Sequence, residues 1–490
     1  MSNLPVLIIA SLLIFAFISA LVGIWKSAGA RITALIGMAL SFAAACTGLY
    51  QVLHHGTLRH FLGGWPPPIG IEYVLDNLSA FMIVIITFIG MIAVIYPPQA
   101  GLYIKPRKVI PTYGMILLLI GGLAGVVVTG DLFNLFVFLE IYSLASYALI
   151  TLGGDRAVVA SFRYLILGTI AGSFYLLGIG FIYFTTGTLN MADAAQLLPS
   201  MYTSPAVMTG VALIVVGMGI KMALFPLHVW LPDAHSYAPP TIAAVLAAIQ
   251  VETGAYVVVR MMLSVFSPEY FIQTLPITTI IGWVSAIGII FGSIMAIAQK
   301  DFKRMLAYST VGQVAYIGIG IGLANPLGLI GALLHILNHA FMKSCLFLVA
   351  GGIRHHTGLH HIPEFAGLGR RMPLMMAGFT VAALSMVGIP PMCGFFSKWY
   401  LVLGSLEAHN YVFAGVIVAS SLLTAVYFFR VIEKVFARPE EDRPEIQQAR
   451  EPGPSILVPI LILAVGMIAL GLANAAIVNG ILDKIVAPLG

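Results

Sequence analysis

Long apolar stretches separated by short polar loops recur along the whole chain. Most stretches hold about 20 residues, the length that an α-helix needs to cross the hydrocarbon core of a bilayer. The pattern therefore predicts an all-α polytopic membrane protein with about fourteen transmembrane helices. The expected spans lie near residues 4–24, 32–53, 77–97, 109–128, 131–152, 161–186, 206–230, 240–264, 276–299, 304–323, 326–352, 372–403, 411–436 and 454–482.

Prolines interrupt two of these spans at membrane depth. Pro226 lies inside the seventh expected helix, and Pro390 and Pro391 lie inside the twelfth. A helix broken at this depth survives only where protein or a water-filled path accepts the freed backbone groups. The broken spans are five helices apart, and a unit of five spans enters the membrane from opposite sides in successive copies. We therefore predict two inverted five-helix repeats, each containing a broken helix.

The repeats divide the chain into four expected segments. Residues 1–108 form an N-terminal three-helix segment, and residues 437–490 form a cytoplasmic loop and the C-terminal helix. Between them, residues 109–275 form the first repeat (helices four to eight) and residues 276–436 form the second (helices nine to thirteen). The two halves share little sequence, so this division rests on helix count and proline placement.

Composition and charge agree with a membrane protein. Only 9% of the residues are charged and 60% are hydrophobic, whereas a soluble domain carries about 25% charged residues. Most of the 24 Lys and Arg residues fall in alternate loops, and the opposite loops hold only Arg59, Arg260 and Lys484. The positive-inside rule makes the basic side cytoplasmic and places both termini outside, in a multi-pass protein of the cell membrane.

The sequence lacks the common signatures of a redox or nucleotide site. Cys46, Cys345 and Cys393 are scattered through apolar stretches without a C-x-x-C pair, which argues against an iron–sulfur cluster, a structural zinc or a disulfide framework. It contains no phosphate-binding loop and no dinucleotide fingerprint. We therefore expect no cofactor and no metal in this chain. The chain could still be a subunit of an enzyme complex whose redox sites lie in other subunits.

Ionisable residues inside the expected spans are the strongest functional signal. Glu140 lies in the fifth span, Lys221 in the seventh and Glu252 in the eighth. A charge at bilayer depth costs at least a few kcal/mol, so such residues usually line a polar cavity or pair with one another. We favour an ion pair between Glu140 and Lys221 over a packing role for Glu140. Together with the broken helix, these residues indicate an ion or proton path.

The eleventh span adds a polar helix face. His335, His339 and Lys343 recur every four residues and so line one side of the helix. A histidine pair at this spacing could bind zinc, but no Glu follows the first His as in H-E-x-x-H, and Lys343 would repel a metal. We therefore predict a proton-relay stripe that leads to Lys398, which follows the second break.

Other polar residues near these positions are expected to be accessory to the same path. They are His228, Asp233 and His235 after the first break, and Ser309, Thr310 and Gln313 in the tenth span.

The loop RHHTGLHHIPEFAGLGRRMP contains four histidines and invites a metal-site interpretation. Arginines lie close by, however, and no acidic or thiol ligand is arranged among the histidines. We therefore expect a solvated cytoplasmic loop.

Several stretches resemble the antiporter-like membrane subunits shared by respiratory complex I, Mrp-type cation/proton antiporters and membrane-bound hydrogenases. They span residues 130–405 in the family's order and read FVFLEIYSLASY, KMALFPLHVWLPDAHSYAPPT, ETGAYVVVR, DFKRMLAYST, HILNHAFMKSCLFL and GIPPMCGFFSKWYLV. The segment TTGTLNMADAA, and the absence of a long lateral C-terminal helix, make the chain most similar to the D-type component of Mrp antiporters and its hydrogenase counterpart. The resemblance implies the same fold of about fourteen helices with two inverted five-helix repeats.

The resemblance also implies roles for individual residues. Glu140 and Lys221 match the family's ion pair, and Lys398 matches the second-half lysine that faces the exit path. His335, His339 and Lys343 match the polar stretch of helix eleven. Two positions depart from the family pattern: Glu252 stands where a central lysine is usual, and Gln313 stands where many members have a histidine. Glu252 could bind and release a proton or coordinate Na⁺.

These observations predict a proton- or Na⁺-translocating subunit of a multisubunit membrane complex. The favoured hypothesis is the D-type component of an Mrp monovalent cation/proton antiporter. The alternative is a proton-pumping subunit of a redox complex, of the membrane-bound hydrogenase or NADH–quinone oxidoreductase type. A third hypothesis is a self-contained secondary transporter for an organic solute. The expected partners are other membrane subunits of the same complex, further antiporter-like subunits among them, the lipid bilayer, and H⁺ or Na⁺, but no nucleic acid.

Overall fold

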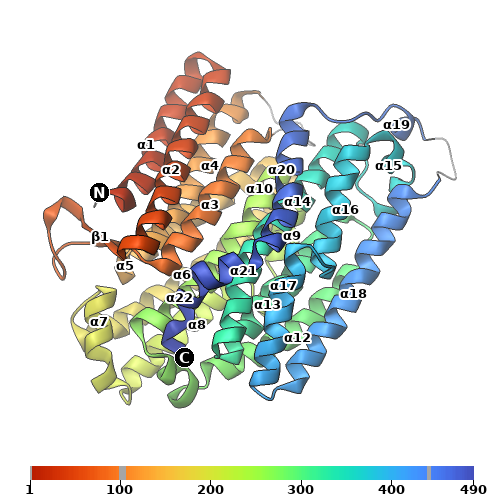
Figure 1. The fold of residues 1–490 in the computed structure, drawn as a ribbon. Coiled ribbons are helices and arrows are strands. Elements are labelled where there is room, and N and C mark those ends of the chain that lie inside the picture. The colour runs from red at the N-terminus through yellow and green to blue at the C-terminus, as the bar shows by residue number, and fades with distance from the viewer. Residues whose placement is uncertain (1–2, 99–105, 439–442, 490) are drawn as a thin grey trace.

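The computed structural model describes residues 3–98, 106–438 and 443–489, and it is almost entirely helical (Figure 1). The N-terminal part contains α1 (Leu4–Trp25), α2 (Ser27–His55), a hairpin of β1 (Leu58–Phe61) and β2 (Glu72–Leu75), and α3 (Asn77–Ile95). The next elements are α4 (Pro106–Val128), α5 (Leu132–Ile150), α6 (Asp155–Thr186), α7 (Met191–Leu197), α8 (Pro205–Lys221), α9 (Leu231–Tyr237), α10 (Pro240–Val245) and α11 (Val251–Arg260).

The second half of the chain is also helical. It contains α12 (Ile277–Ala298), α13 (Phe302–Leu323), α14 (Pro326–Thr357), α15 (Leu368–Arg371), α16 (Pro373–Val387), α17 (Cys393–Glu407) and α18 (Tyr411–Phe436). The C-terminal part contains α19 (Pro444–Gln447), α20 (Pro454–Leu472), α21 (Asn474–Ile477) and α22 (Asp483–Val486). Part of the expected cytoplasmic loop, residues 439–442, lies outside the described residues.

The described part of the chain has twelve helices long and apolar enough to cross a membrane. Two shorter apolar helices, α8 and α16, occupy the first halves of the two spans that were expected to be broken. The all-α polytopic membrane fold is therefore confirmed. The exact number of crossings, the two inverted repeats and the segment boundaries stay predictions.

Short polar residues start several of these helices. Asp76 and Ser79 form a capping box at the start of α3, and the side chain of Asp131 accepts a hydrogen bond from the backbone of Asn134 in α5. Asn190 caps α7, and Asp301 caps α13. These side chains accept hydrogen bonds from the amides that have no partner in a helix's first turn.

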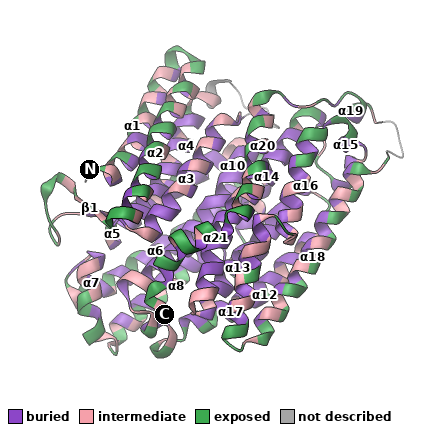
Figure 2. Ribbon diagram, in the orientation of Figure 1, coloured by how far each residue is buried: buried purple, intermediate pink, exposed green. Residues whose placement is uncertain are grey.

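The helices differ in how much surface they bury. The continuous span from α10 to α11 and the long helix α14 lie at the centre and are almost wholly buried, whereas α6, α12 and α18 expose one side (Figure 2). Helices α1 to α4 group at one side of the molecule, and α12 and α18 lie at the other (Figure 1). Large apolar residues stay exposed on the outer helices, among them Phe162 and Phe184 on α6. An outer apolar surface around a more polar centre is what lipid requires.

The first break differs from the sequence prediction in its position. The break contains Pro226, as the sequence predicts, but it begins earlier and is longer than expected, because α8 ends at Lys221 and the helical path resumes only at Leu231. The residue before a proline is disfavoured in the helical conformation, and Ala223 has a positive φ of 54°. The break therefore begins directly after the lysine, so that Lys221 ends its helix.

The second break lies where the sequence predicts it. Helix α16 ends at Val387, Gly388 adopts φ 92°, and α17 begins at Cys393. Pro390 and Pro391 fill the connection and are exposed. The amide of Asn338 on α14 donates to the carbonyl oxygen of Cys393 at 2.7 Å and fixes the start of α17.

Candidate functional site: a buried row of ionisable side chains

Lys221 is buried at the end of α8, with 2% of its surface exposed. Its Nζ donates a hydrogen bond to the Ser143 hydroxyl on α5 at 2.7 Å and lies 5.5 Å from the centre of the Tyr142 ring. Glu140, one turn earlier on α5, is only half-buried and acts on Lys221 electrostatically. It forms no ion pair with any described residue. The expected pair is therefore close in space but not in direct contact.

A second hydrogen-bonded group connects α5 to the central span. Ser146, one turn after Ser143, donates to Oε1 of Gln250 at 2.8 Å, and Nε2 of Gln250 donates to the Tyr164 hydroxyl. Gln250 belongs to a π-helical turn, Leu246–Gln250, directly before α11. Such π-turns often occur at functional sites. These residues were not predicted from the sequence, although Ser143 and Ser146 share one face of an apolar helix and Gln250 lies two residues before Glu252 in another apolar span.

Glu252 and His339 meet at the centre of the molecule. Both side chains are 0% exposed, and Oε1 of Glu252 contacts Nδ1 of His339. The two residues come from α11 and α14 and are 87 positions apart. The carboxylate that replaces the family's usual lysine is therefore joined directly to the histidine stripe.

The stripe itself forms as the sequence predicts, on one buried face of α14. His335 and His339 have ring centres 5.8 Å apart, and Nδ1 of His335 lies 3.0 Å from the hydroxyl oxygen of Ser397 on α17. Lys343 donates from Nζ to the carbonyl oxygen of Leu306 at 2.9 Å and to the hydroxyl of Ser309. Three helices therefore contribute to this part of the row.

Lys398 lies beside the second break. Its Nζ donates to the carbonyl oxygens of Met386 at 2.8 Å and Val387 at 3.2 Å, and to Ser421 on α18 at 3.2 Å. The same atom lies 5.0 Å from the centre of the Tyr316 ring. The lysine thus satisfies carbonyl groups that the end of α16 leaves without partners.

Several buried polar atoms along the row have no protein partner among the described residues. They are Oε2 of Glu252, Nε2 of His335, Nε2 of His339, Oε1 of Gln313 and both ring nitrogens of His235. Buried polar groups are normally hydrogen-bonded to protein or to ordered water. We therefore expect water between these side chains, which would connect them into one hydrated path.

Not every expected residue belongs to this row. Asp233 forms ion pairs with Arg163 at 2.9 Å and Arg304 at 3.2 Å and so ties α9 to α6 and α13. Thr310 donates within its own helix, to Leu306. His228 is buried between aromatic rings, with ring centres 5.5 Å from Phe225 and 5.0 Å from Phe291. None of these three residues forms a hydrogen bond or ion pair with an ionisable side chain of the buried row.

Another buried ion pair lies near the β-hairpin. Arg260, at the end of α11, pairs with Asp76 at the start of α3 and donates to the Tyr256 hydroxyl at 2.7 Å. Burial opposes ionisation of Asp76, but the charge and hydrogen bonds of Arg260 outweigh it and hold the pKa of the carboxyl far below its usual range. The sequence places Arg260 near the outer end of the expected span 240–264, and in the structure it is the last residue of α11, with 6% of its surface exposed.

A protein-family profile described as "NADH:quinone oxidoreductase/Mrp antiporter, TM" matches residues 129–424. The chain belongs to this family. The matched range contains the whole buried row from Glu140 to Lys398, and the resemblance inferred from the sequence motifs is confirmed.

Two relatives within the NADH:quinone oxidoreductase/Mrp antiporter family match over nearly their whole lengths. The N-type component of the NADH-quinone oxidoreductase of Desulforudis audaxviator is 48% identical over 98% of each chain. The D-type component of the Na(+)/H(+) antiporter of Alkalihalophilus pseudofirmus is 32% identical over 90% of this chain and 87% of the relative. These identities favour the quinone-oxidoreductase alternative over the Mrp antiporter interpretation.

Solved structures of complexes contain chains with the same fold. A chain of the membrane-bound sulfane sulfur reductase, an archaeal respiratory membrane complex, matches with a TM-score of 0.89 at 30% identity and full coverage of both chains. A chain of the Mrp complex from Dietzia sp. DQ12-45-1b matches with a TM-score of 0.87 at 25% identity, and the match covers 100% of this chain and 99% of that one. A chain of respiratory complex I from Thermus thermophilus shares the fold, with a TM-score of 0.76 at 24% identity, and the match covers 96% of this chain and 98% of that one.

Proposed function

We propose that this chain is a proton-translocating membrane subunit of a redox-driven complex of the NADH–quinone oxidoreductase type. The observation that carries the proposal is the set of buried ionisable side chains Lys221, Glu252, His339, His335 and Lys398, whose two end members, Lys221 and Lys398, lie beside the two helix breaks. Ionisable side chains are costly inside a membrane protein and usually mark an ion or proton path. The expected partners are other membrane subunits of the same complex, in the cell membrane.

The geometry supports proton exchange at defined atoms. Glu252 and His339 share a hydrogen bond, so a proton can pass between Oε1 and Nδ1 without an intervening group. The rings of His339 and His335 are 5.8 Å apart, so that step needs a water molecule. The centre of the Tyr316 ring lies 5.3 Å from that of His335 and 5.0 Å from Nζ of Lys398. These distances support a continuation of the path to the second break.

Glu140 and Lys221 would set the charge at the other end of the row. Burial disfavours the charged form of an amine, and a nearby carboxylate favours it. Protonation of Glu140, or its movement away from Lys221, would therefore release a proton from the lysine into the row. The present separation of the two groups fits a pair that is made and broken during turnover.

The type of complex is supported by the 48% identity to a component of an NADH-quinone oxidoreductase over 98% of the chain. The second candidate is the D-type component of an Mrp cation/proton antiporter, which the TM-score of 0.87 to a chain of an Mrp complex supports. The two candidates differ in the energy source. Electron transfer to quinone would drive proton movement in the first, and a Na⁺ gradient would drive it in the second.

The test is proton transport by the purified assembly in liposomes that contain a pH-sensitive dye. We expect Lys221→Ala and Glu140→Ala each to abolish this chain's share of the proton transport driven by NADH and quinone. The matched controls Lys484→Ala and Glu407→Ala change the same residue types at exposed positions and should transport normally. Wild-type rates in both path variants would contradict the proposal. Transport that responds only to a Na⁺ gradient would favour the antiporter, and activity of the isolated chain would favour a stand-alone transporter.

A further inference from the structure

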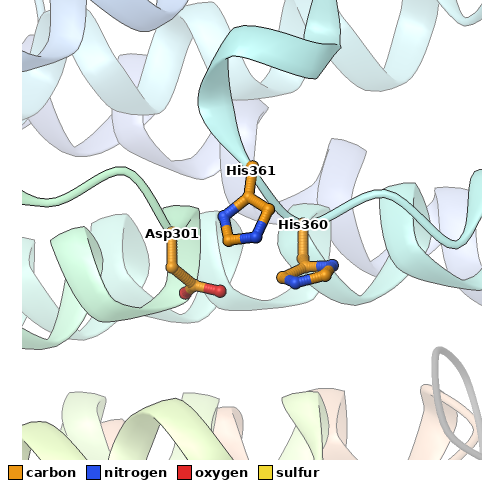
Figure 3. Close-up of side chains that lie close together, drawn as sticks. All are labelled: Asp301, His360 and His361. Atoms are coloured by element: carbon orange, nitrogen blue, oxygen red, sulfur yellow. The ribbon is translucent and has the colours of Figure 1, made fainter.

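Two segments that are far apart in the sequence place three metal-ligand side chains together. Asp301, at the start of α13, faces His360 and His361, in the loop after α14 (Figure 3). One ligand atom from each residue lies within 4.8 Å of the other two. The loop was expected to bind no metal because no acidic ligand stands among its histidines, and the fold supplies that ligand from 59 residues upstream in Asp301.

Backbone pairing fixes the two segments relative to one another. Asp301 and His361 form an isolated antiparallel bridge. The amide of Phe302 donates to the carbonyl oxygen of His360 at 3.0 Å, and the amide of Ile362 donates to that of Lys300 at 2.9 Å. The three side chains are therefore held together by main-chain hydrogen bonds and do not depend on a mobile surface contact.

Each ligand can turn toward a common ion. Oδ1 of Asp301 accepts from the backbone amide of Arg304 at 2.8 Å, which orients the carboxylate and leaves Oδ2 available. The His360 side chain forms no hydrogen bond with a described residue, and its ring lies against that of His361, with ring centres 4.1 Å apart. The His361 ring accepts from the Glu364 amide in a capping box and would exchange that bond for the metal.

The cluster opens into a cavity of about 480 Å³ at the surface, which gives an ion access. Arg156, Arg304 and Arg354 line the same cavity, together with Asp155. Arg304 is already paired with Asp233, and water at this exposed site screens the other two arginines. An open coordination position facing arginines would suit a water molecule or a small anion as the fourth ligand.

From this geometry we infer that Asp301, His360 and His361 form a surface site for a divalent transition metal, with Zn²⁺ as the best match. Two imidazoles and one carboxylate are a common zinc ligand set, and hard cations such as Mg²⁺ prefer oxygen ligands. The ion would connect the loop after α14 to the start of α13. The inference is independent of the proposed proton transport.

The test is a Zn²⁺ titration of the purified assembly that carries the full-length chain without a histidine tag, with bound zinc measured by calorimetry. We expect the wild type to bind one more equivalent per chain than His360→Ala. Asp301→Asn keeps the helix cap, because Asn also caps helices well, but should weaken binding at least about tenfold through loss of the anionic ligand.

A nearby histidine pair provides the control. His355 and His356 are adjacent and exposed, with ring centres 5.0 Å apart, but they belong to no such ligand cluster among the described residues. His355→Ala/His356→Ala should therefore bind zinc like the wild type. The inference is overturned if His360→Ala and Asp301→Asn bind zinc like the wild type. It is also overturned if His360→Ala weakens zinc binding but Asp301→Asn does not, or if the control His355→Ala/His356→Ala loses the same equivalent of bound zinc.

Discussion

At the scale of single residues, the contact between Glu252 and His339 is the most informative feature. Each residue was predicted to belong to the path, but their contact could not be, because they lie on helices separated by 87 positions. A carboxylate beside a histidine offers a proton donor and acceptor in one hydrogen bond. A family-typical lysine at this position could not accept that bond while charged. The departure at position 252 therefore changes the chemistry of the row and does not interrupt it.

The Asp76–Arg260 pair allows a residue-scale test of stability. Asp76→Asn keeps the helix cap but leaves the Arg260 guanidinium without its carboxylate. We expect a loss of about 2–4 kcal/mol at pH 7, because removing one partner of a buried pair leaves an uncompensated charge. Thermal unfolding in detergent measures it. Arg443→Gln, at a half-exposed pair, should change stability by less than about 1 kcal/mol.

The same pair predicts how the stability of the protein changes with pH. The pKa of the Asp76 carboxyl is lower in the folded than in the unfolded protein, so the pair stabilises the fold at pH values above the pKa of an unfolded Asp, about 4. That stability is lost as the pH falls below this value and the carboxyl protonates. The difference between wild type and Asp76→Asn should therefore shrink from pH 6 toward about pH 3. A difference that stays constant or grows over this range would contradict the assignment.

At the scale of elements, the two broken helices show how the fold accommodates freed backbone groups. At the first break, Nε1 of Trp230 donates to the carbonyl oxygen of Ile220 at 2.9 Å. At the second, Lys398 donates to two carbonyl groups of α16. Proline placement in the sequence predicts both breaks. It could not predict their partners, because these come from side chains whose positions depend on tertiary packing.

Replacing Trp230 tests the first break. Trp230→Phe keeps the ring that stacks on Tyr164 at 4.0 Å but removes the donor to Ile220. We expect a loss of about 0.5–1.5 kcal/mol in stability, the usual net contribution of one hydrogen bond, because the Ala223 amide still donates to the Ile220 carbonyl oxygen at 3.1 Å. Trp283→Phe, at an exposed site on α12, should have little effect in the same unfolding experiment. Equal unfolding temperatures for both variants would argue against this role.

At the scale of the whole molecule, hydropathy predicts most of the fold, because lipid requires long apolar helices whatever lies inside them. The expected ranges agree with the observed helices to within a few residues over most of the chain. What the sequence hid were contacts between distant segments: Gln250 with Ser146, and Asp301 with the histidine loop. The spacing of residues within one segment cannot show these contacts, because the partner of each residue lies in a segment far away in the chain.

Orientation in the membrane is the remaining whole-molecule prediction. The excess of Lys and Arg in alternate loops predicts that the end carrying Arg156, Arg304 and Arg354 is cytoplasmic. In a Cys46→Ser background, His355→Cys should react with a membrane-impermeant thiol reagent only from the cytoplasmic side. Ser200→Cys, beyond the far end of α6, should react only from outside. Reaction of both positions from one side would contradict the predicted topology.

The most direct measurement is the number of protons moved per NADH oxidised by the assembly in liposomes, compared between wild type and Glu252→Gln. Gln fills the same space but cannot exchange a proton with His339. We predict that electron transfer continues in the variant while this chain's share of the proton movement is lost, whereas Glu407→Gln, at an exposed position, leaves the ratio unchanged. An unchanged proton count in Glu252→Gln would contradict the proposal that the buried row carries protons.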